Sequence, residues 1–272
     1  MTAVFAPLDS RALVRLSGPD WRAFLQGLIS NDVEALPTGE MRFAALLTPQ
    51  GRLLFDMFVT AESDGCRLDV QAARRQALID RLLIYRLRAK VDIAADDGQV
   101  CALWGAGLAP DGWTRDPRLG DLGFRGADLA APEGAVPEDE AAYDGFRLDL
   151  GVPDPARDCL PDKTYPIEAD FDLLNGIDFK KGCYVGQETT SRMKRRGGIR
   201  SRMLPITFEG PPPAFGAEVL AGELRAGEVL SGREGRAMAL LRLDRIAGAE
   251  LSVDGRSVRA WRPPWLADAP KG

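Results

Sequence analysis

The stretch RFAALLTPQGRLLFDMFVT, residues 42–60, decides the fold. It holds two apolar runs of strand length, and Pro49-Gln50-Gly51 separates them. Two such runs on either side of a turn that contains Pro and Gly are typical of a β-hairpin. The sequence therefore predicts antiparallel strands at this point.

Elements of both kinds flank this hairpin. Strand patterns occur at 11–16, 66–70, 89–95 and 99–105, and helical patterns occur at 21–29 and 72–88. The order over residues 11–104 is thus β-α-β-β-β-α-β-β, which predicts an α+β fold with a mainly antiparallel sheet under two helices.

The remainder of the chain divides into three parts. Residues 105–136 are rich in Gly, Pro and Asp and are predicted to form a subdomain edge or a long connection, and residues 137–150 are predicted to be a helix. After Arg200, short β-type runs separated by turns predict a small all-β barrel or sandwich. These runs are 203–208, 217–221, 223–231, 236–243, 250–255 and 257–261.

Composition excludes several classes of protein and of site. The 272 residues carry a net charge of −5 and contain no histidine, so histidine-based nucleophiles, zinc sites and acid/base catalysts are ruled out. The four cysteines form no CxxC pair, and Cys66 and Cys101 lie in apolar strand patterns that predict core positions. The sequence has no apolar run of membrane-spanning length and no secretory pattern at its start, which predicts a cytoplasmic protein with no membrane partner.

The densest polar and glycine pattern is KKGCYVGQE at 180–188. Two lysines flank the central cysteine, and glycines let the backbone approach a ligand. Nearby positive charge stabilises a thiolate, as would the backbone N–H groups of a helix beginning near Gly186. Cys183 is therefore the candidate reactive residue, and a buried cysteine in a tight turn is the structural alternative.

The motif resembles the signature of the YgfZ family, relatives of the glycine-cleavage T-protein (aminomethyltransferase) that serve iron–sulfur cluster assembly or repair. Residues 24–59 are similar to the T-protein stretch that leads into its folate site, and residues 146–153 and 165–170 resemble the segments before the KGC motif. The resemblance implies a T-protein-like region at 1–200, with a ferredoxin-like subdomain at about 1–104 and a second at about 105–200. A C-terminal β-barrel follows at 201–272.

The resemblance also implies a site and its ligands. Cys183 would act singly, by redox exchange, a mixed disulfide or transient ligation of a cluster, and no permanent metal is expected. Tetrahydrofolate is the implied cofactor. Its predicted contacts are Asp56, Arg147, Glu168, Tyr184 and Gln187, with motif support from Lys181, Gly182, Gly186, Glu188 and Arg192. The implied partners are folate and iron–sulfur client or assembly proteins.

Two alternatives remain open at this point. A true folate-dependent one-carbon transferase would use Asp56 to assist attack on an aminomethyl group, so the sequence does not decide whether the protein is an enzyme. An RNA-contact module would use the basic run at 192–202, which is predicted to be a loop. The acidic net charge and the scarcity of aromatic residues near that run argue against nucleic acid.

Overall fold

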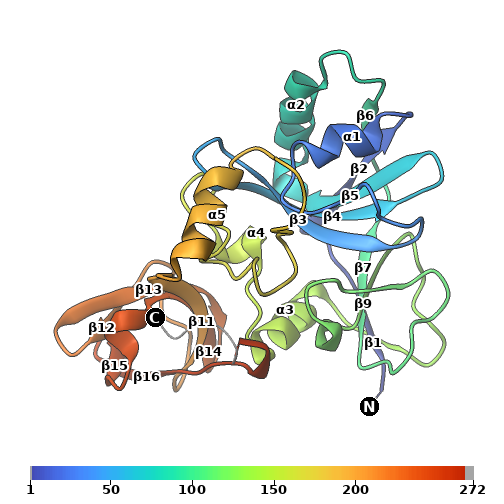
Figure 1. Cartoon of the computed structure of the whole chain (residues 1–272). Helices are drawn as coiled ribbons and strands as arrows, with labels where there is room; N and C mark the ends of the chain where they lie inside the picture. Colours follow the sequence, from blue (N-terminus) through green and yellow to red (C-terminus); the bar gives the residue numbers. More distant parts are fainter. Residues whose placement is uncertain (1, 267–272) are drawn as a thin grey trace.

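The computed structural model describes residues 2–266, and these form three lobes (Figure 1). The hairpin predicted at residues 42–60 is present as the antiparallel pair β3 (Met41–Leu47) and β4 (Leu53–Ala61). It belongs to a five-stranded sheet in the order β3-β4-β5-β2-β6. The other strands are β5 (Gly65–Gln71), β2 (Arg11–Ser17) and β6 (Asp92–Asp96).

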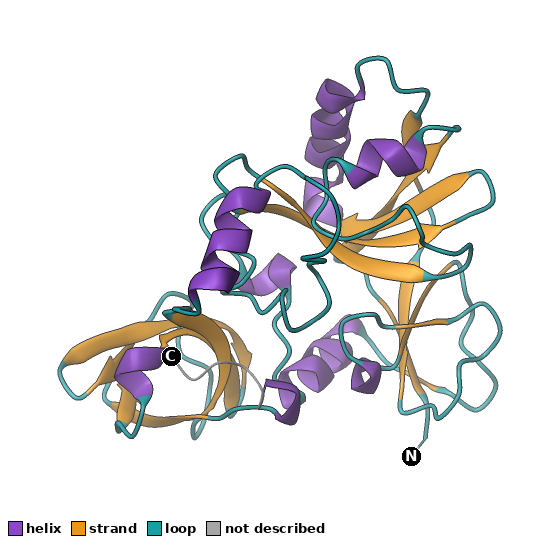
Figure 2. Ribbon diagram, viewed as in Figure 1, coloured by secondary structure: helices purple, strands orange, loops and turns teal. Residues whose placement is uncertain are grey.

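Two helices cover one face of this first sheet (Figure 2). They are α1 (Trp21–Gln26) and α2 (Arg75–Arg86), which follows a short 3-10 turn, η1 (Ala72–Arg74). Because side chains alternate along a strand, Phe55 and Met57 pack under the helices while Phe58 points to the other face. That other face looks toward the centre of the molecule and carries Asp56, the candidate polar residue of β4.

The second sheet has the order β10-β1-β7-β9-β8. Its strands are β10 (Val136–Pro137), β1 (Val4–Pro7), β7 (Val100–Trp104), β9 (Phe124–Ala127) and β8 (Thr114–Arg115), with η2 (Gly120–Leu122) between the last two in sequence. The sheet joins strands from both sides of residue 104, because β1 pairs with β7 and with β10. The sequence predicted a boundary between two subdomains at residue 104, at the end of a strand. In the structure, one sheet contains strands from both sides of that boundary.

The last lobe is a closed barrel in the order β11-β14-β13-β12-β15-β16. Its strands are β11 (Ser201–Thr207), β14 (Arg236–Arg242), β13 (Leu224–Arg233), β12 (Glu218–Ala221), β15 (Leu251–Val253) and β16 (Arg256–Ala260). Helix α6 (Leu243–Ile246) and the turn η3 (Pro264–Leu266) complete it. Each of the six predicted β runs corresponds to one barrel strand, so the α+β fold with a C-terminal barrel is confirmed.

Three helices lie where the lobes meet: α3 (Glu140–Asp149), α4 (Pro155–Asp158) and α5 (Gln187–Arg196). Helix α3 contacts β1 and β14, and α4 contacts β13. No helix in the described range 2–266 is long and apolar enough to cross a membrane.

Candidate functional site

Cys183 lies in the turn that precedes α5, and its side chain is exposed. The other three cysteines differ: Cys66 and Cys101 are buried in the core as predicted, and Cys159 is half-buried at the end of α4. Burial raises the pKa of all three thiols above its ordinary value. Cys183 is therefore the one thiol that a large partner can reach directly.

Lys181 fixes one end of this turn. Its ammonium group donates hydrogen bonds to the carbonyl oxygens of Gln26, Ile29 and Asn31, at 2.9, 2.7 and 2.7 Å. These carbonyls lie at and after the C-terminal end of α1, where a cation interacts favourably with unpaired carbonyl groups. Desolvation lowers the pKa of Lys181 to about 8. Its three hydrogen bonds therefore anchor the turn to the first lobe, a role that the sequence did not indicate.

Gly186 fixes the other end of the turn. It caps α5 with φ of +80°, and a Cβ atom there would lie 2.4 Å from the Thr48 carbonyl oxygen. Gly51, in the β3–β4 turn, lies beside Gly186 and contacts the same helix, since its Cβ would lie 2.8 Å from the Cβ of Thr189. A helix does begin near Gly186 as predicted, and Glu188 in its first turn suits the positive end of the helix dipole.

The remaining motif residues have different surroundings. Tyr184 is buried in the central apolar cluster, and burial raises its pKa to about 12. Gln187 is half-buried at the start of α5, and its backbone N–H donates to the Tyr184 carbonyl oxygen at 3.3 Å. Gly182 is exposed, with nothing within 4 Å of a Cβ atom at that position.

Asp56 lies on the central face of β4 and is buried. One carboxylate oxygen accepts a hydrogen bond from Arg11 at 2.7 Å, and the other makes no hydrogen bond within residues 2–266. Arg11 also donates to Asp69, whose second oxygen accepts from Arg125. Asp56 therefore belongs to a buried network of alternating charges that sequence reasoning did not predict.

Glu168 is half-buried and accepts a hydrogen bond from the Tyr165 backbone N–H at 3.0 Å. Burial raises its pKa. Burial raises the pKa of the Cys159 thiol, and the charges of Asp158, Asp56, Asp154 and Glu168 add to this shift.

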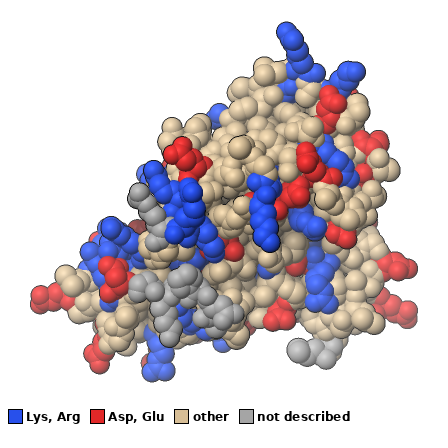
Figure 3. All heavy atoms as spheres, viewed as in Figure 1, with Lys and Arg blue, Asp and Glu red and all other residues tan. Residues whose placement is uncertain are grey.

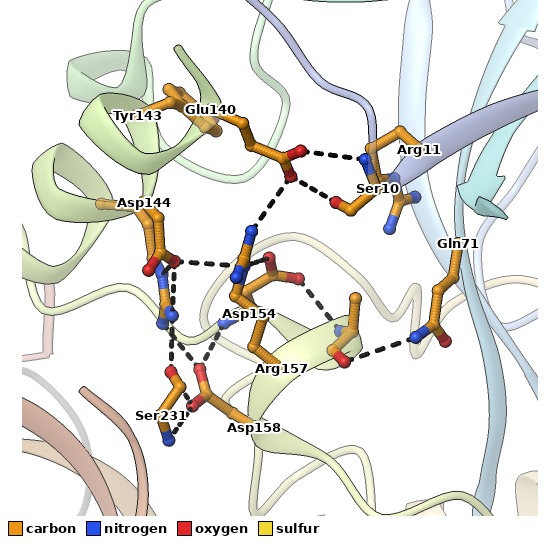
Figure 4. A network of polar contacts seen from close by, with 12 residues as sticks. Ser10, Arg11, Gln71, Glu140, Tyr143, Asp144, Asp154, Arg157, Asp158 and Ser231 are labelled. Atoms are coloured by element: carbon orange, nitrogen blue, oxygen red, sulfur yellow. Dashed lines mark hydrogen bonds and ion pairs between the residues drawn. The ribbon is translucent and has the colours of Figure 1, made fainter. Parts of the chain in front are cut away.

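Arg147 is almost completely buried, and its guanidinium group is fully engaged by the chain itself. It donates to Asp144 at 2.8 Å, to Asp158 at 2.6 Å and to the Ser231 hydroxyl at 2.6 Å. Figure 4 shows the surrounding contacts, in which Asp158 faces Ser231 and Arg157 lies among several carboxylates. These contacts give Arg147 a structural position between α3, α4 and the barrel.

The loop predicted at 192–202 is confirmed only for residues 197–200 and is wrong for the rest of the run. Residues 192–196 form the second half of α5, and Arg202 lies in β11 with its guanidinium group buried against Asp170 and Asp172, at 2.6 and 2.9 Å. Lys194 also pairs with Asp172. Arg192 is exposed on α5, where Lys and Arg side chains gather on the molecular surface (Figure 3).

The predicted site residues therefore fall into two groups. Asp56 and Arg147 line one small cavity of about 20 Å³ between the lobes, whereas Cys183, Gly186 and Gln187 lie in the turn at the start of α5. Within residues 2–266, no hydrogen bond or ion pair connects the two groups. The same residues contain no cluster of three or more Cys, Asp or Glu side chains that could hold a metal ion.

Comparison with known proteins places these features in a family. The model of the CAF17 C-terminal beta-barrel domain matches residues 200–268. The mitochondrial iron-sulfur cluster assembly factor IBA57 of Mus musculus is 32% identical, over 89% of this chain and 78% of that protein. The mitochondrial IBA57 homolog of Mycosarcoma maydis is 34% identical over 77% of this chain, which spans only 59% of that relative.

Among solved structures, the glycine cleavage system aminomethyltransferase T from Bartonella henselae is similar, with a TM-score of 0.79 and 19% sequence identity. The match covers 100% of this chain and 88% of that one. It confirms the predicted T-protein-like fold. The predicted cytoplasmic location is contradicted, because these relatives are mitochondrial proteins by name. That prediction relied on the lack of a targeting pattern, which is weaker evidence than the compartment of the relatives.

Proposed function

The chain belongs to the family of the IBA57 iron–sulfur cluster assembly factors, and from this premise we propose that it is an accessory factor in the assembly or repair of iron–sulfur proteins. The family likeness extends over 89% of the chain, and the resemblance first noted in the KGCYVGQE motif is confirmed by it. The partners in this role would be iron–sulfur client or assembly proteins.

Cys183 is the residue that we propose to carry the function, and its exposure in a turn fixed at both ends is the observation that supports this. Once its proton has passed to water, the thiolate would donate an electron pair to an iron atom of a cluster in transit. A single protein thiolate leaves most iron coordination to the partner, so the cluster is a cargo. The hydrogen bonds of Lys181 and the close contact at Gly186 would hold the Cys183 sulfur at the surface, where a partner protein can reach it.

The test is a substitution at Cys183 in cells that lack their own factor of this family. We expect Cys183→Ser to lower the activity of a [4Fe–4S] enzyme in extracts at least tenfold relative to the wild-type chain, at equal protein level. Gly182→Ala is the matched control, because the neighbouring position is exposed and has room for a methyl group. Full activity with Cys183→Ser would overturn the role of the thiolate.

Tetrahydrofolate is the ligand that we propose for the chain, with support from the similarity of residues 24–59 to the T-protein stretch. The cavity that Asp56 and Arg147 share has a volume of about 20 Å³, which is roughly the space of a single water. These two residues therefore do not fit a pterin between them.

Neither alternative function gains support from the geometry. A one-carbon transferase would need the folate beside Asp56, where the cavity is too small. An RNA-contact module would use the cations of 192–202, of which Lys194 and Arg202 are already paired with carboxylates while Arg192 and Arg195 are exposed. Assembly of iron–sulfur proteins is therefore the only function proposed.

A further inference from the structure

Helix α2 is apolar on both of its sides toward its C-terminal end. Leu78, Ile79 and Leu82 are buried in the core of the first lobe. Leu83 and Ile84 lie on the outer side of the helix and are 40% and 65% exposed. A surface helix ordinarily carries polar residues on its outer side, so these two apolar side chains are uncovered by the part of the chain that the structure describes.

Leu87, directly after the last turn of α2, extends this apolar surface. Its side chain is 87% exposed, and its backbone has φ of +44°, a conformation that residues with large side chains rarely adopt. Backbone strain of this kind is typical of functional positions. Leu83, Ile84 and Leu87, which we call the α2 patch, are therefore better suited to contact with another body than to the stability of the free chain.

Positive charge accompanies the α2 patch. The segment 81–91 contains no acidic residue, and its four cations are Arg81, Arg86, Arg88 and Lys90. Three carboxylates lie near the segment in sequence or in space, namely Asp20, Asp80 and Asp92. Within residues 2–266 none of them pairs with these cations, whereas Arg75 at the start of the helix does pair, with Asp97. The end of α2 is thus locally basic in a chain whose net charge is −5, and it favours an anionic partner.

The shape of this end favours a broad surface as the partner. Figure 1 shows the end of α2 and its connection to β6 at the upper extreme of the molecule, and Figure 3 shows Lys and Arg side chains projecting there. The α2 patch is purely aliphatic, whereas Trp, Tyr and Arg dominate the binding energy at protein–protein interfaces. A second copy of this chain would bring like charges together. A projecting tip of aliphatic side chains and cations matches the boundary of a lipid bilayer instead.

We propose that the end of α2 binds the surface of a bilayer that contains anionic phospholipids. The α2 patch would enter the boundary between head groups and acyl chains, and the four cations would contact lipid phosphates. Binding at one face of a bilayer needs no spanning helix, so the expectation of no membrane partner, which relied on the lack of a spanning segment, does not apply to it. Helix α5 lies apart from this end (Figure 1), so the bound chain would keep the Cys183 turn accessible.

The experiment is flotation of the whole chain with vesicles on a density gradient. We expect the wild-type chain to bind vesicles of phosphatidylcholine with about one third phosphatidylglycerol at least fivefold better than vesicles of phosphatidylcholine alone. Ile84→Asn and Arg88→Glu should each lower binding at least threefold. Leu87→Gly should also lower binding while leaving the midpoint of urea unfolding unchanged or higher, because glycine adopts positive φ without strain.

Two substitutions in the barrel are the matched controls. Leu224 is 65% exposed, as Ile84 is, so Leu224→Asn makes a similar loss of exposed apolar surface outside the α2 patch. Arg259 is exposed on β16, so Arg259→Glu repeats the charge reversal of Arg88→Glu. Both controls should bind the anionic vesicles as the wild-type chain does.

Three outcomes would overturn the proposal. The first is absence of binding to anionic vesicles, or equal binding to both kinds of vesicle. The second is binding by Ile84→Asn and Arg88→Glu that equals that of the wild-type chain. The third is absence of vesicle binding together with a loss of [4Fe–4S] enzyme activity in cells that carry Ile84→Asn, which would assign the α2 patch to a protein partner. The Cys183→Ser result tests the proposed function separately from all of these.

Discussion

At the scale of single residues, Lys181 has the least ordinary environment in the motif. An ammonium group that is largely removed from water is costly unless it is hydrogen-bonded, and here three carbonyl oxygens receive it. The desolvation that remains lowers its pKa to about 8, compared with 10.5 for the free side chain. Lys181 is thus a titrating anchor under mildly alkaline conditions.

This anchor predicts a pH dependence of stability. Between pH 8 and 10.5 the unfolded chain binds the Lys181 proton more tightly than the folded chain does, so the free energy of unfolding rises with pH in this window. The wild-type chain should therefore gain about 1 kcal/mol over Lys181→Met between pH 8 and 10.5, after allowance for partial solvent screening. Urea unfolding at several pH values measures the difference, and a constant difference would contradict the prediction.

Sequence reasoning predicted some of these residues because their signals are local. The apolar strand patterns around Cys66 and Cys101 predicted burial, and the polar glycine-rich pattern marked Cys183 as a candidate. The partners of Lys181 were not predictable, since they lie about 150 residues earlier in the chain. The same holds for the contact of Asp56 on β4 with Arg11 on β2. It depends on the pairing of both strands with β5 and not on neighbouring residues in the sequence.

At the scale of elements, the decisive contact is the approach of the β3–β4 turn to the start of α5. We expect Gly186→Ala to lower the free energy of unfolding by more than 2 kcal/mol, because the methyl group would clash with the Thr48 carbonyl oxygen in addition to the strain at positive φ. Urea unfolding measures the loss, and the rate of Cys183 alkylation in the native state reports on the turn.

Gly197→Ala is the control for this substitution. Gly197 ends α5 with φ of +64°, but nothing lies within 4 Å of its Cβ position. It should therefore show the backbone strain alone, about 1 kcal/mol. Equal losses at Gly186 and Gly197 would mean that the close approach to β3 contributes nothing.

Elements with a clear apolar period were predicted well, and the others were not. The six barrel strands and the hairpin at 42–60 have a clear pattern of apolar residues, and they are present as predicted. Helix α5 does not: its sequence QETTSRMKRR is almost entirely polar, so its second half was interpreted as a basic loop. Packing at Gly51 and the capping glycines at both ends compensate for the missing apolar face, and neither is visible as a hydrophobic pattern.

At the scale of the whole molecule, buried ion pairs join the lobes. Arg147 on α3 donates to Asp158 of α4 and to Ser231 of β13. Arg147→Met should lower the free energy of unfolding by about 3 to 5 kcal/mol, because it leaves buried carboxylates without their partner. Urea unfolding followed by tryptophan fluorescence measures the change.

Arg233→Met is the matched control for Arg147→Met. Arg233 also connects β13 to α3, through Asp149 at 2.5 Å, but this pair lies at the surface and Arg236 contacts the same carboxylate. Exposed pairs contribute at most about 1 kcal/mol, so the loss should be small. Similar losses in the free energy of unfolding for both variants would show that burial of the Arg147 network does not add to the stability of the contact between the lobes.

The place of β1 in the second sheet has a consequence for the order of events during synthesis. Val4 pairs with Trp104 on one side and with Val136 on the other, so β1 is an interior strand of a sheet whose remaining strands are synthesised much later. The first sheet, in contrast, has no strand later in the chain than β6, so all its strands can pair while β1 is still unpaired. Until its neighbours emerge, β1 presents two open edges, and the nascent chain is most vulnerable to wrong pairing in that interval.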